Sequence, residues 1–76
     1  AGGLDSAHNQ LYRSLLEKEQ WSRKEATELC GNLNLMLGGA LEVINDWSYA
    51  VVDAPVLDDA DDDIWVDLEI AKELEG

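Results

Sequence analysis

Residues 50–67 read AVVDAPVLDDADDDIWVD, and the spacing of the apolar side chains changes within this stretch. Up to Val52 the apolar residues continue a helical pattern, and Pro55 ends it because a proline disfavours helical geometry in the residue before it. Beyond Pro55, the two groups VLD and IWV flank a run of aspartates, which is typical of two strands joined by a turn. The stretch therefore predicts a helix followed by a small β-hairpin with an acidic tip.

Three helices are predicted before this hairpin. The first begins at Asp5 or Ser6, either of which can act as an N-cap, and continues to about residue 19. The second begins at the capping box SRKE, residues 22–25, and stops near Asn34, since asparagine tolerates the left-handed conformation of a helix end. The third and longest helix covers residues 37–51, where an apolar stripe recurs at helical spacing.

A short final helix is predicted to begin after Asp67 as N-cap and to end at Gly76. We therefore expect a mainly α fold with a small β-hairpin (α+β), in which three helices and the hairpin have a winged-helix-like order. A single domain would cover residues 4–76, preceded by a flexible N-terminus at residues 1–3. Because the chain starts with AGG rather than with methionine, we expect it to be part of a longer protein.

Acidic side chains dominate the chain, which has 17 Asp and Glu against 5 Lys and Arg and a net charge of -12. Residues 1–52 carry seven acids and four bases (net -3), whereas residues 53–76 carry ten acids and one base (net -9). Such a field repels phosphate backbones and attracts cations or basic protein surfaces. The third helix also contains no Lys or Arg with which to contact DNA. The charge pattern therefore argues against a nucleic-acid partner.

Membrane insertion and catalysis also lack sequence support. No apolar run approaches the roughly 18 residues of a membrane-spanning helix. The single Cys30 lies on an apolar helical face, which predicts a buried, inert thiol and a cytoplasmic location. Cys30 and His8 are lone residues of their kinds and form no recognisable nucleophile and base motif. We therefore expect a protein that is not an enzyme.

The acidic turn is the candidate site. Carboxylate oxygens are the preferred ligands of Ca²⁺ and Mg²⁺, and a divalent cation would relieve repulsion between neighbouring aspartates. The candidate metal ligands are Asp58, Asp59, Asp61, Asp62 and Asp63. The alternative is a solvated turn whose charges prevent the hairpin edge from pairing with other chains. The residues alone leave both hypotheses open.

An EF-hand is the one defined calcium motif that this turn approaches. Asp59, Asp61 and Asp63 have the spacing of its first, third and fifth positions. The sixth position, however, is Ile64 instead of glycine, and the twelfth is Ile70 instead of glutamate. Any cation site here would therefore be a looser carboxylate cluster.

Several motifs resemble the TerB-C domain, the C-terminal domain found after TerB in bacterial tellurite-resistance-associated proteins. They are WSR (21–23), LMLGGALEVINDW (35–47), DAPVLDD (53–59) and the acidic hairpin, and the resemblance covers nearly all of residues 11–75. It implies an accessory domain that accompanies TerB-type modules in stress response and phage defence. It also implies metal chelation by Asp53, Asp58, Asp59, Asp61, Asp62 and Asp63, together with Glu42 and Asp46.

Together, the residues and the resemblance favour a non-enzymatic accessory domain. We expect it to dock onto other domains of the same longer protein or onto a basic protein surface, with a divalent cation (Ca²⁺ or Mg²⁺) at the hairpin as a candidate ligand. One alternative is a purely structural interaction domain without metal. The other is a winged-helix-type module associated with nucleic acid.

Overall fold

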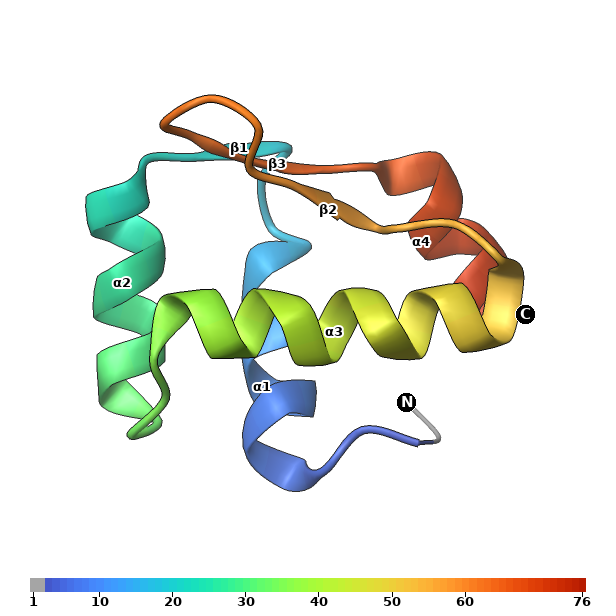
Figure 1. Cartoon of the computed structure of the whole chain (residues 1–76), viewed down its shortest axis with the longest axis horizontal. Helices are drawn as coiled ribbons and strands as arrows, with labels where there is room; N and C mark the ends of the chain where they lie inside the picture. The colour runs from blue at the N-terminus through green and yellow to red at the C-terminus, as the bar shows by residue number, and fades with distance from the viewer. Residues whose placement is uncertain (1–2) are drawn as a thin grey trace.

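The computed structural model describes residues 3–76 and contains four helices and one three-stranded antiparallel sheet (Figure 1). The elements follow the order α1 (Ser6–Leu15), β1 (Gln20–Trp21), α2 (Arg23–Asn32), α3 (Leu37–Val52), β2 (Leu57–Asp58), β3 (Ile64–Val66) and α4 (Leu68–Glu75). The predicted α+β class, with its hairpin and its final helix, is confirmed. The winged-helix likeness stays an interpretation of this element order. Residues 1 and 2 of the expected flexible N-terminus lie outside the described residues.

Local capping explains where three of the helices begin. Asp5 is the N-cap of α1, and its side chain accepts a hydrogen bond from the backbone N–H of His8. At α2, both halves of the predicted capping box are present: Glu25 N–H donates to Ser22 Oγ at 3.0 Å, and Ser22 N–H donates to Glu25 Oε1 at 2.9 Å. The side chain of Asp67 caps α4 by accepting hydrogen bonds from the backbone N–H groups of Glu69 and Ile70. These predicted helix starts are confirmed.

The first helix is shorter than expected, because the chain turns towards β1 after Leu15. The indole N–H of Trp21 lies 2.9 Å from the carbonyl oxygen of Leu15 and 3.2 Å from that of Lys18. These backbone acceptors are therefore satisfied by a side chain rather than by further helical turns. The result is a tight link between α1 and the sheet.

The sheet contains a strand that the sequence did not predict. β3 is central and pairs with both β2 and β1, with Gln20 opposite Trp65 and Trp21 opposite Ile64. β1 is only two residues long, which is too short for the alternating pattern that identifies a strand. Its pairing with β3 connects the α1–α2 link to the hairpin, so the expected two-stranded hairpin is part of a three-stranded sheet.

The longest helix, α3, runs along the molecule beneath the sheet, with α2 near one of its ends and α4 near the other (Figure 1). Tyr12 of α1 packs edge-on against Trp47 of α3, with ring centroids 5.2 Å apart. Trp21 and Trp47 are buried, whereas Trp65 is 42 % exposed. None of the helices within residues 3–76 has the length and apolarity needed to span a membrane.

The end of α3 determines where the hairpin begins. Asp53 adopts a left-handed conformation (φ 60°) and stops the helix, and its N–H still bonds the carbonyl of Tyr49. The buried Ser48 hydroxyl donates to the carbonyl of Ala54, which holds the exit segment against the helix. β2 therefore starts beside α3 and contacts it.

Candidate functional site

The tip of the β2–β3 hairpin is shaped by its own aspartates. Asp58 Oδ1 accepts the N–H of Ala60 at 2.9 Å, and Asp61 Oδ1 accepts the N–H of Asp63 at 2.9 Å. Both bonds connect a side chain with the backbone two residues later, which is the Asx-turn arrangement. The aspartates thus stabilise the conformation of the turn in addition to giving it a negative charge.

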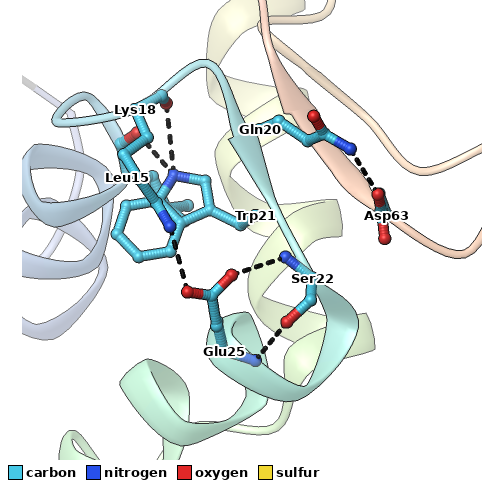
Figure 2. A network of polar contacts seen from close by, with 7 residues as sticks. All are labelled: Leu15, Lys18, Gln20, Trp21, Ser22, Glu25 and Asp63. Carbon is cyan, nitrogen blue, oxygen red and sulfur yellow. Dashed lines mark hydrogen bonds and ion pairs between the residues drawn. The ribbon is translucent and has the colours of Figure 1, made fainter.

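Two further contacts fasten this tip to the rest of the molecule. The side-chain amide of Gln20 in β1 donates to Asp63 Oδ2, as Figure 2 shows. A guanidinium nitrogen of Arg23, at the start of α2, lies 3.6 Å from Asp59 Oδ2. Because both contacts are exposed, each contributes little on its own to stability. They connect the tip to β1 and to the start of α2.

The five predicted metal ligands are neighbours on this turn, but most of their carboxylates face separate partners. Within residues 3–76, no three His, Cys, Asp or Glu side chains are grouped so that they could hold a metal ion. Of the other acids implied by the resemblance, Glu42 and Asp46 lie exposed on α3, and Asp53 lies at its end. The divalent-cation site stays a prediction.

A groove of about 530 Å³ lies beside the hairpin, between the end of α3, the α3–β2 connection and α4. Tyr49, which is 52 % exposed, and Ile70 give it apolar surface. Asp58 and Asp59 of the hairpin add negative charge to its lining. The lining residues are Asn45, Tyr49, Ala54, Pro55, Val56, Leu57, Asp58, Asp59, Ala60, Asp67 and Ile70.

A second groove, of about 320 Å³, shares Asp58 and Asp67 with the first and lies over the junction of β3 and α4. Trp65 and Leu68 provide exposed apolar surface there. The other lining residues are Val66 and the acids Glu19, Asp58, Asp67 and Glu69. The hairpin is therefore flanked by two grooves that combine exposed apolar side chains with acids.

The outward position of Trp65 follows from strand alternation. Successive side chains of a strand point to opposite faces of a sheet, and in β3 Ile64 and Val66 are the buried ones. Ile64 and Val66 therefore belong to the hydrophobic core, while Trp65 lies on the opposite, exposed face of the strand. The sequence did not predict that Glu19 lines the same groove, because its position there depends on the unpredicted pairing of β1 with β3.

Cys30 and His8 lie in separate environments. Cys30 is fully buried in the core, and burial raises the pKa of its thiol, so the thiolate needed for nucleophilic chemistry is disfavoured. His8 Nδ1 lies 2.6 Å from Oδ1 of Asp5, the α1 N-cap. The predicted burial of the thiol is confirmed.

Comparison with protein families gives a match over nearly the whole chain. The family model described as TerB-C domain matches residues 1–75, which is essentially the whole chain and includes all four helices, the sheet and the acidic hairpin. Searches of curated proteins and of solved structures found no match.

Proposed function

Since this chain belongs to the TerB-C domain family, an accessory domain associated with tellurite resistance, we propose that it is a non-enzymatic docking domain. Its acidic hairpin and the two flanking grooves bind a basic surface of another protein domain, in the same longer protein or in a separate one. The observation that carries this proposal is the gathering of acids and exposed apolar side chains at the hairpin. Tyr49, Trp65 and Leu68 are all exposed beside it.

Charge supports this choice of partner. Residues 53–76 carry ten acids against one base, so a basic surface is attracted over a long range and a nucleic-acid backbone is repelled. The turn is already ordered by the hydrogen bonds of Asp58 and Asp61. Binding therefore loses less conformational entropy than it would with a disordered acidic loop.

The docking function can be tested by amide NMR titration of the chain with octalysine at several NaCl concentrations. We expect saturable shifts confined to the hairpin and the start of α4, with affinity that weakens as salt rises. Duplex DNA is the parallel probe for the nucleic-acid alternative, and a salt-sensitive, saturable shift with DNA would favour that alternative.

Two charge-matched double variants sharpen the test. Asp59→Asn with Asp62→Asn removes two negative charges from the hairpin, while Glu28→Gln with Glu42→Gln removes two from exposed positions on α2 and α3. Docking at the hairpin predicts that only the first pair weakens octalysine binding substantially. Equal weakening by both pairs would indicate general counterion attraction and would contradict the proposal.

Divalent-cation binding is a second candidate role for the same hairpin, where it would stabilise or regulate docking. Its support is the five carboxylates within residues 58–63, whose mutual repulsion a Ca²⁺ or Mg²⁺ ion would relieve. Titration with each ion should then give saturable shifts restricted to residues 58–67. Non-saturating shifts spread over all acidic residues would contradict a site.

A further inference from the structure

We infer that the groove between Trp65 and Leu68 receives an arginine side chain of the partner protein, with its guanidinium stacked on the Trp65 indole and paired with the surrounding carboxylates. The inference rests on the proposed docking function and assigns the chemistry of the group that docks. Its basis is the combination, at one place, of an exposed aromatic ring, an apolar neighbour and several acids.

The composition of the groove selects a cationic and partly apolar occupant. Trp65 is 42 % exposed and Leu68 36 %, so the groove offers an aromatic and an aliphatic surface. Glu19, Asp67 and Glu69 also line it, and its lining contains no Lys or Arg that could neutralise them. An arginine side chain matches both features, since its methylene stem packs on apolar surface and its head carries the opposite charge.

The indole is held in place before any partner binds. Trp65 Nε1 lies 3.3 Å from each carboxylate oxygen of Asp61, on the hairpin tip. This contact orients the ring edge towards the acidic turn. Because the ring is already oriented, stacking on it loses little side-chain entropy.

The chain itself contains a filled arrangement of this kind. Lys18 Nζ lies 4.3 Å from the ring centroid of Trp21 and 3.0 Å from Glu25 Oε2, so one cation contacts an aromatic ring and a carboxylate together (Figure 2). Around Trp65 the ring and the carboxylates are present, and a partner would supply the cation. We favour arginine over lysine because the planar guanidinium stacks on indole and can bond carboxylates through two N–H groups.

The test compares octaarginine with octalysine, which carry the same charge. We expect both peptides to shift the hairpin amides, with octaarginine binding about tenfold more tightly and shifting the Trp65 indole N–H resonance. Trp65→Leu should remove most of this preference by weakening octaarginine binding about tenfold and changing octalysine binding little. Thermal unfolding of the variant verifies that it is folded.

A second comparison leaves Trp65 intact. Glu19→Gln with Glu69→Gln removes two charges from the groove, and Glu28→Gln with Glu42→Gln is the charge-matched control. The groove pair should weaken octaarginine binding several-fold more than the control pair does. Equal affinities of the two peptides would overturn the inference. So would a preference for octaarginine that is unchanged both in Trp65→Leu and in the variant with Glu19→Gln and Glu69→Gln. Either outcome would leave the proposed docking at the hairpin intact. Absence of saturable hairpin shifts with either peptide would overturn both.

Discussion

The carboxamide of Asn45 forms two hydrogen bonds with the backbone of Leu57: its Nδ2 donates to the Leu57 carbonyl and its Oδ1 accepts the Leu57 N–H, both at 2.9 Å. Leu57 faces Val66 of β3 on the other side of β2. Asn45 of α3 therefore supplies the hydrogen-bond partners that a further strand would supply at the free edge of β2. The arrangement anchors a two-residue strand on the helix and blocks strand addition at Leu57.

Replacing Asn45 with alanine should lower the free energy of unfolding by about 3 kcal/mol, because two backbone groups of the buried Leu57 lose their partners. Urea unfolding monitored by tryptophan fluorescence measures the change. Asp46→Ala, at the exposed neighbouring position, is the control and should stay within about 0.5 kcal/mol of the parent chain. Similar stabilities of the two variants would mean that the Asn45 bonds do not anchor β2.

The left-handed residue at the end of α3 predicts a difference in stability between two substitutions at the same position. Asp53 has φ 60°, and glycine adopts this conformation without the steric cost of a Cβ atom. Asp53→Gly should therefore be more stable than Asp53→Ala by about 1 kcal/mol in thermal unfolding. Both variants remove the negative charge of Asp53, which interacts unfavourably with the negative C-terminal end of the helix dipole. The comparison of the two variants therefore isolates the backbone effect. Equal stabilities would contradict a left-handed residue here.

Tyr12 carries a buried hydroxyl that has no hydrogen-bond partner among the described residues. Burial, with a smaller contribution from the charge of Glu75, raises the pKa of this phenol. Removing an unsatisfied polar group relieves its desolvation cost, so Tyr12→Phe should leave stability unchanged or raise it by up to about 1 kcal/mol. Tyr49→Phe, at an exposed position, is the control and should have no effect. A clear loss of stability in Tyr12→Phe would show that the hydroxyl has a partner in solution.

The capping box of α2 should make stability depend on acid pH. The hydrogen bond from the Ser22 backbone and the side-chain contact with Lys18 lower the pKa of Glu25 below its ordinary value of 4.5. The resulting stabilisation is present above pH 4.5 and is lost as the pH falls through the lower pKa of the folded state. Glu25→Gln should therefore flatten the fall in stability below pH 4.5.

Urea unfolding between pH 3 and pH 6 compares this variant with Glu28→Gln, which removes a charge from the same helix outside the capping box. An identical pH dependence for the two variants would contradict the role of the cap.

Several features of this protein were determined by the sequence itself, because the interactions behind them are local. The capping box joins Ser22 and Glu25, three residues apart, and the Asp67 cap reaches only to Ile70. The change of apolar spacing at Pro55 predicted both the end of α3 and the hairpin. Charge is a property of composition, so the prediction of a basic partner also needed no coordinates.

Only the tertiary structure decided the remaining features, because they depend on contacts between distant parts of the chain. Gln20 and Asp63 are 43 positions apart, and the short β1 exists through its pairing with β3. The same pairing places Glu19, the residue before β1, in the groove beside Trp65. Closing such a loop costs entropy that no local pattern offsets, and the burial of the whole core is needed to compensate it. The helices and the charge could therefore be predicted from short segments, whereas the sheet and its grooves could not.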